Sequence, residues 1–136
     1  MFPARFDQLR VLRAFLEAFC AQAAIGEDNC LRLNLVLEEL FTNTVKHGHG
    51  GGSDAPVWLT LTAGERQIKV TYEDSAPAFN PYARLPESAP DITLEPRAAP
   101  RTVGGLGVLL TRRLAASRDY AYLYGRNCIR LALSLE

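Results

Sequence analysis

Six of the eight prolines fall within one stretch of about thirty residues, between Asp74 and Val103. Proline lacks the backbone N–H group and is excluded from long helices and from central strands. The regular elements of the fold must therefore form before and after this stretch. Because too little sequence follows it for a second domain, we expect a long loop within one domain and not an interdomain linker. Loops of this length are either disordered or functional, and we expect a lid over about residues 75–103.

Hydrophobic periodicity predicts helices and strands on both sides of this loop. Apolar residues that recur at intervals of three and four predict amphipathic helices over about 6–24, 30–47 and 104–116. Alternating β-branched and aromatic residues predict strands over about 57–62, 67–73, 120–124 and 128–135, with turns at 63–66 and 125–127. Helices on one face of a mixed, mostly antiparallel sheet make an α+β fold, a two-layer α/β sandwich.

Composition narrows the class of protein. The 136 residues suffice for one domain with a core, and Lys plus Arg (15) balances Asp plus Glu (15). A chain without net charge has no broad positive field to hold nucleic acid or an anionic membrane. No apolar run reaches membrane-spanning length and no signal-peptide pattern is visible, so we expect a cytoplasmic protein. The three widely spaced cysteines, Cys20, Cys30 and Cys128, predict buried free thiols, not a disulfide framework or a metal site.

The predicted second helix carries a group of polar residues at helical spacing. With about 100° per residue, Glu39, Asn43 and Lys46 share one narrow wedge beside the apolar stripe. Oxygen ligands suit Mg²⁺, and a carboxylate can accept the proton of an attacking hydroxyl group, so the wedge suits a magnesium-bound polyphosphate. A solvated helix face with one i,i+4 polar pair would contain the same residues. Glu38 is expected to face solvent, and His47 to cap the helix or pack in the core.

Two other segments carry candidate binding groups. Asp74 directly follows a predicted strand, where its carboxylate could accept a hydrogen bond from an exocyclic amine such as that of adenine. The alternative is an Asx turn in which Asp74 only caps its own backbone. The glycines at 104, 105 and 107 precede the third predicted helix, where backbone N–H groups can converge on an anion. Glycines also make tight entries to helices, and this cluster lacks the Gly-Lys-Ser/Thr end of a P-loop.

The order of these motifs resembles the GHKL, or Bergerat-fold, superfamily of ATP-binding proteins, which includes gyrases, MutL and sensor histidine kinases. Within it, the chain is most similar to the stand-alone anti-sigma-factor serine/threonine kinases, over almost its whole length. The N box is matched by Glu39-Leu-Phe-Thr-Asn43, followed by His47-Gly48. The first glycine box, of pattern D-x-G-x-x-F, is matched in part by residues 74–79, and the second, of pattern G-x-G, by residues 105–107.

The resemblance implies ATP and Mg²⁺ as ligands and suggests a role for each matched residue. Glu39 would be the general base, Asn43 the magnesium ligand and Asp74 the contact to adenine. Further nucleotide-binding positions would be Lys46, His47, Ala76, Phe79, Arg101, Thr102, Gly104, Gly105, Leu106 and Gly107. The glycines at 105 and 107 would wrap the phosphates, and Arg101, at the end of the proline-rich loop, is our candidate for a γ-phosphate contact.

Two departures from the family pattern lead to further expectations. Ala76 stands where the family has glycine. If that position required a positive φ, alanine would cost about 1 kcal/mol and weaken nucleotide binding. The chain also begins close to the first predicted helix, so we expect the N-terminal strand of many relatives to be short or absent.

Three functions are compatible with these features. The first is an ATP-dependent kinase that phosphorylates a serine or threonine of a protein partner, a sigma factor or an anti-anti-sigma-type protein, in the manner of anti-sigma regulators. The second is a nucleotide-gated switch that binds its partner with little or no kinase activity. The third is a relative of the histidine-kinase catalytic domain, although no helical phosphoacceptor domain is visible. A homodimer is compatible with each of them.

Overall fold

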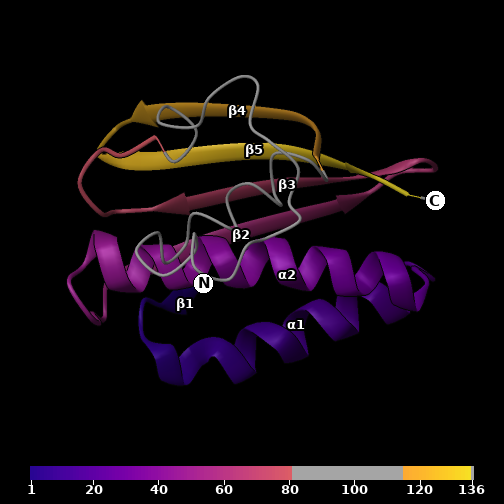
Figure 1. Ribbon diagram of the computed structural model, residues 1–136, viewed down its shortest axis with the longest axis horizontal. Helices are drawn as coiled ribbons and strands as arrows, with labels where there is room; N and C mark the ends of the chain where they lie inside the picture. Colours follow the sequence, from indigo (N-terminus) through magenta and orange to yellow (C-terminus); the bar gives the residue numbers. More distant parts are fainter. Residues whose placement is uncertain (81–114, 136) are drawn as a thin grey trace, which may run out of the picture.

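The computed structural model describes residues 1–80 and 115–135. These residues form a five-stranded sheet with two long helices on one side of it (Figure 1). The helices are α1 (Leu9–Gln22) and α2 (Glu27–Asn43), preceded by a 3-10 turn at Phe6–Gln8. The strands are β1 (Phe2–Pro3), β2 (Pro56–Ala63), β3 (Gln67–Asp74), β4 (Ala115–Leu123) and β5 (Arg126–Ser134). This arrangement confirms the predicted α+β sandwich. Within the described part of the chain, neither helix is long and apolar enough to cross a membrane.

The strands follow the order β1-β2-β3-β5-β4, and each of the four pairings is antiparallel. The described sheet is therefore antiparallel throughout and not mixed. The N-terminal strand, β1, has only two residues, as expected. The predicted hairpin between β2 and β3 is confirmed, with the N–H of Gly64 donating to the carbonyl oxygen of Gln67 at 2.8 Å.

The last hairpin differs from the predicted one in both its strands and its turn. The predicted turn at 125–127 is wrong: the turn lies at Tyr124 and Gly125, which have φ angles of 53° and 76°. Two consecutive residues with positive φ form the tight turn that matches the twist of antiparallel strands. As a result, Asn127 belongs to β5. Residues 115 and 116, expected at the end of a third helix, instead begin β4, and the rest of that predicted helix lies outside the described residues.

Both helices bury an apolar stripe at helical spacing, as the periodicity predicted. Leu12, Leu16 and Cys20 of α1 are buried, each four residues from the next. Phe15, three residues after Leu12, is 41% exposed and meets Phe2 edge to face, with 5.6 Å between the ring centroids. The buried residues of α2 are Leu33, Val36, Leu37, Leu40 and Phe41. They pack with alternate residues of the sheet, among them Val57, Ile68, Val70, Ile129, Leu131 and Leu133, in one hydrophobic core.

Glu38 is not simply solvent-facing as predicted. It pairs with Arg13 of α1, and its side chain retains 26% of its exposure. It therefore faces α1, away from Asn43.

The cysteine prediction is wrong for two of the three residues. Cys20 near the end of α1 and Cys30 in the first turns of α2 form a disulfide, with Cα atoms 6.1 Å apart. The turn between the helices brings these positions together, whereas their linear spacing gave no sign of pairing. Cys128 is a buried free thiol, as predicted, and burial raises its pKa.

The disulfide should contribute measurably to the stability of the helical layer. It closes a loop with a sequence separation of ten residues, for which the loss of unfolded-chain entropy is worth about 2–3 kcal/mol. We expect a reductant to lower the free energy of unfolding of the wild type by about this amount in urea titrations. The Cys20→Ser/Cys30→Ser double variant should have a lower free energy of unfolding from the start, and the reductant should not change it. Equal responses of the two proteins would show that the bond makes no such contribution.

Candidate functional site

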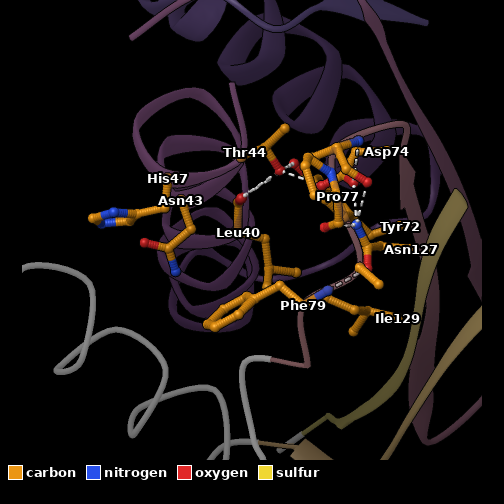
Figure 2. Close-up of a pocket in the computed structure, with 13 residues that line it drawn as sticks. Leu40, Asn43, Thr44, His47, Tyr72, Asp74, Pro77, Phe79, Asn127 and Ile129 are labelled. Atoms are coloured by element: carbon orange, nitrogen blue, oxygen red, sulfur yellow. Dashed lines mark hydrogen bonds between the residues drawn. The ribbon is translucent and has the colours of Figure 1, made fainter. Parts of the chain in front are cut away.

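A cavity of about 350 Å³ opens between the end of α2 and the adjoining ends of β3 and β5 (Figure 2). The segment after β3, residues 76–79, forms another wall. The lining residues are Leu40, Asn43, Thr44, His47, Gly48, Tyr72, Asp74, Ala76, Pro77, Ala78, Phe79, Asn127 and Ile129. A largely apolar cavity of this size with a few convergent polar groups is typical of a small-molecule site.

Asp74 lies at the base of the cavity, 7% exposed, at the end of β3. Thr44 donates a hydrogen bond from Oγ1 to Oδ2 of Asp74 at 2.7 Å. The hydroxyl group of Tyr72 lies 2.6 Å from this Thr44 oxygen and 3.2 Å from the carbonyl oxygen of Leu40, so it also has a partner within the network. Burial raises the pKa of Tyr72 well above its usual value, which keeps the phenol neutral. On the side next to α2, the hydroxyl groups of Thr44 and Tyr72 therefore both have hydrogen-bond partners, and Thr44 holds the carboxylate of Asp74.

Asn127 holds Asp74 from the opposite side. Its side-chain Nδ2 donates to Oδ1 of Asp74 at 2.9 Å. The backbone N–H of Ala76 donates to the same oxygen at 3.1 Å, which is the Asx turn named above as an alternative. Asp74 therefore caps its own backbone and also lines the cavity. A carboxylate accepts about four hydrogen bonds. The described residues provide three, which leaves one acceptor position on Oδ2.

Ala76 fits this site without the backbone strain considered above. Among the described non-glycine residues, only Ala24 and Tyr124 have a positive φ. Ala76 is not among them, so the energetic cost that alanine would have at a position with positive φ does not apply here. Its side chain is buried against Gly48, where an added Cβ atom would lie 2.7 Å from the Cβ of Ala76. The methyl group that departs from the family pattern thus packs onto Gly48, the glycine that follows the N box.

This contact predicts a specific coupling between Gly48 and Ala76. Gly48→Ala should destabilise the fold by about 1–3 kcal/mol, because two methyl groups would overlap in a packed wall. The double variant Gly48→Ala/Ala76→Gly should recover part of that loss in urea or thermal unfolding. Gly26→Ala with Ala76→Gly provides the control, because a Cβ at Gly26 meets no atom within 4 Å and the two effects should add. Additive effects at 48 and 76 would contradict the packing described.

The last turn of the second predicted helix is a π-helical turn, Thr44–Gly48, and not α-helix. The N–H of His49 donates to the carbonyl oxygen of Thr44, five residues earlier, at 3.0 Å. Thr44 and Val45 are buried, whereas Lys46 and His47 are exposed. In Figure 2, Thr44 points toward Asp74, whereas Asn43 and His47 extend from the helix in another direction. Single π turns interrupt helices frequently at functional sites.

Glu39, Asn43 and Lys46 interact as their spacing predicted. Burial raises the pKa of Glu39, and the hydrogen bond from Asn43 and the positive charge of Lys46 partly oppose that rise. Glu39 is half-buried, and its Oε2 atom has no hydrogen-bond partner among the described residues. Asn43 lines the cavity, while Glu39 and Lys46 lie outside its lining. The site therefore has an acidic group with unused acceptor capacity beside an amide, next to the cavity wall.

The remaining predicted residues divide into two groups. His47, Ala76 and Phe79 line the cavity, and Phe79 is 49% exposed. The residues of the second glycine box and its approach, together with most of the predicted lid, lie outside the described residues; they are Arg101, Thr102, Gly104, Gly105, Leu106 and Gly107.

Sequence reasoning missed three polar residues that line the cavity, Thr44, Tyr72 and Asn127, and also Tyr120, which donates a hydrogen bond to Asn127. Two of them had a weak signal. Thr44 lies on the apolar stripe of the helix, four residues after Leu40, where a polar side chain needs a buried partner. Asn127 alternates with Ile129, Leu131 and Leu133, so its side chain had to face the helices once β5 began at residue 126.

The comparisons with known proteins agree with this geometry. The solved structure of Erythrobacter litoralis EL346 blue-light activated histidine kinase is similar in fold, with a TM-score of 0.53 and 17% sequence identity. The similarity covers 82% of this chain and 32% of that chain, so this chain spans about a third of the length of that kinase. No curated protein matches the sequence.

The sequence profile described as "Histidine kinase-like ATPase domain" matches residues 2–133, which is nearly all of the chain. The match includes every helix and strand described above, apart from the last residue of β5, and all the residues that line the cavity. The chain belongs to the histidine kinase-like ATPase domain family.

Proposed function

We propose that the chain binds Mg-ATP in this cavity and transfers the γ-phosphoryl group to a serine or threonine of a protein partner. The observation that carries the nucleotide assignment is Asp74, a buried carboxylate with one acceptor position left, in a largely apolar cavity of about 350 Å³. The ionised carboxylate of Asp74 can accept a hydrogen bond but not donate one, so it favours the exocyclic amine of adenine over the keto group of guanine. The half-exposed ring of Phe79 offers an apolar surface for the base.

The polyphosphate would lie toward Asn43, at the end of α2, and His47, on the π-helical turn, which both extend away from Asp74 (Figure 2). Lys46 and His47 are exposed there and could approach the negative charge of the phosphates. No group of three or more His, Cys, Asp or Glu residues in the described chain could hold a metal ion alone. This fits Mg²⁺, which protein sites commonly bind through one or two side chains together with the phosphates of the substrate. The oxygen of Asn43 would supply such a ligand, and bound Mg²⁺ would neutralise charge on the phosphates.

Glu39 would accept the proton of the attacking hydroxyl group. As the serine oxygen forms its bond to the γ-phosphorus, the bond from that phosphorus to the bridging oxygen breaks and ADP leaves. The raised pKa of Glu39 and its partnerless Oε2 atom suit a group that gains a proton in the reaction. We propose the partner class from the resemblance to anti-sigma regulators: a sigma factor or an anti-anti-sigma-type protein. The lid over about 75–103 stays a prediction.

A second candidate acceptor is a histidine, because the fold is similar to that of a blue-light activated histidine kinase. Incubation with γ-labelled ATP and candidate partners that contain an anti-anti-sigma-type domain separates the possibilities. Transfer of label in an acid-stable form would support a serine or threonine acceptor, and acid-labile label would support histidine. Nucleotide-dependent capture of the partner without transfer would support the switch.

A further inference from the structure

Asn127 is 5% exposed and lies directly opposite Asp74 in the register of β3 and β5. Both ends of its side chain are engaged. Besides Asp74, its Nδ2 has the carbonyl oxygens of Ala76 and Pro77 as acceptors, each at 3.0 Å. Its Oδ1 accepts from the backbone N–H of Phe79 at 2.9 Å and from the hydroxyl group of Tyr120. One amide therefore connects the carboxylate at the base of the cavity to the segment that forms its wall.

We infer that Asn127 is a positioning residue that sets the base selectivity of the cavity, by orienting Asp74 and fixing the turn at residues 76–79. This inference rests on the proposed binding of ATP. Asn127 donates on the side of Asp74 and accepts on the side of Phe79, and both requirements must be met at once. A carboxylate of the same shape could accept on both sides but not donate, and the hydroxyl group of a serine lies on a side chain too short to reach both Asp74 and Phe79.

The consequence for the nucleotide follows from the three hydrogen bonds to Asp74. Asn127 and Ala76 use the capacity of Oδ1, and Thr44 takes one position on Oδ2. The free position is therefore on a single oxygen in a fixed direction. An amino group at the facing position of a base would meet this acceptor, whereas a keto oxygen would meet it as a second acceptor and be repelled. We expect a preference for ATP over inosine triphosphate of about 10- to 150-fold, the range for a hydrogen bond to a charged group.

Asn127→Asp tests the role directly, because the introduced carboxyl group keeps the shape of the amide and makes its donor depend on pH. Burial and the nearby Asp74 should raise the pKa of the introduced group. Below that pKa it carries a proton, which can replace the Nδ2 donation to Asp74. Above it, two carboxylates face each other and the site is disrupted. The titratable groups around it are Asp74 and Tyr72 on β3, Tyr120 and Tyr122 on β4, and His47 on the π-helical turn.

The measurement is the dissociation constant for ATP and for inosine triphosphate by calorimetry between pH 5 and 8, for wild type and variant. The ratio of variant to wild type cancels any titration shared by both proteins. For ATP, this ratio should be near one at the acid end and then rise by up to tenfold per pH unit above the pKa of the introduced group, because binding requires one bound proton. The preference for ATP should fall over the same range.

Two variants control the test. Asn34→Asp makes the same change at a half-buried amide that donates to the backbone oxygen of Cys30, away from the cavity, and its ratio should stay near one. If Asn127→Asp unfolds at high pH, Asn127→Ser provides a second test, because it places no charge in the interior. It should weaken ATP binding about tenfold and lower the preference for ATP, because the shorter serine side chain cannot reach in both directions and Phe79 or Asp74 loses its partner.

Three results would overturn the inference. The first is a pH-independent ratio near one for Asn127→Asp, and the second is an unchanged preference for ATP in Asn127→Ser. The third is a wild type that binds neither nucleotide. Only the third would also remove the proposed function, so the two failures are distinguishable.

Discussion

Asp74→Asn should weaken ATP binding by about 10- to 150-fold, the largest loss of affinity that we expect from a change so small in shape. The substitution keeps the volume and one oxygen but introduces an NH₂ group where only acceptors fit. Thr44, Ala76 and Asn127 all direct donors at the carboxylate. At least one of these donors would lose its acceptor, and the charged acceptor for the base would be gone, a change worth about 1.5–3 kcal/mol.

Calorimetric titration with Mg-ATP measures this loss, and thermal unfolding of each protein shows whether the fold survives. Asp119→Asn is the matched control, because Asp119 is an exposed strand residue on β4 that pairs with Arg130, outside the cavity. Its affinity for ATP should equal that of the wild type. Affinity of Asp74→Asn within twofold of the wild type, in a folded protein, would remove Asp74 from the nucleotide site.

Glu39→Gln should reduce phosphoryl transfer by about 10²- to 10⁴-fold while leaving ATP binding close to that of the wild type. Glutamine keeps the shape of the side chain and its contact with Asn43 but cannot accept the proton of the attacking hydroxyl group. Glu38→Gln is the neighbouring control, since Glu38 pairs with Arg13 of α1 and lies outside the cavity. Transfer by Glu39→Gln at the wild-type rate would exclude Glu39 as the base.

The same residue gives a pH dependence with a definite sign. Burial raises the pKa of Glu39 above its usual value, so its basic form appears only at a higher pH than for an exposed glutamate. The rate of transfer should therefore rise as the pH increases through this raised pKa and then level off. The acid limb of the profile should vanish in Glu39→Gln. An acid limb of equal size in both proteins would assign it to another group.

Local patterns predicted the parts of the fold that depend on near neighbours in the sequence. Apolar residues at intervals of three and four located α1 and α2, and alternation located β2 and β3 with the hairpin between them. The relation of Glu39 to Asn43 also follows from helical spacing alone, and the structure shows them in contact. The fold class could be predicted because helices and strands can bury their apolar faces against one another in only a few layered arrangements.

The parts that sequence reasoning missed depend on how distant segments meet. The pairing of Cys20 with Cys30 requires the packing of α1 on α2, and linear spacing does not reveal it. Asn127 was placed in a turn, and only the register of β5 on β3 brings it opposite Asp74. The hydrogen bond from Thr44, in the π-helical turn Thr44–Gly48, to Asp74 likewise joins residues thirty positions apart, and helical spacing does not reveal it.

Calorimetric titration of the wild-type chain with ATP, in the presence of Mg²⁺ and again with excess chelator, tests the central claim most directly. We predict saturable binding of one ATP per chain with Mg²⁺ and a marked loss of affinity without it, because the charge of three phosphates requires the metal ion. In Asn43→Ala, the affinity should be low with or without Mg²⁺. Absence of binding at millimolar ATP with Mg²⁺, in a protein shown to be folded, would contradict the assignment of this cavity as a nucleotide site.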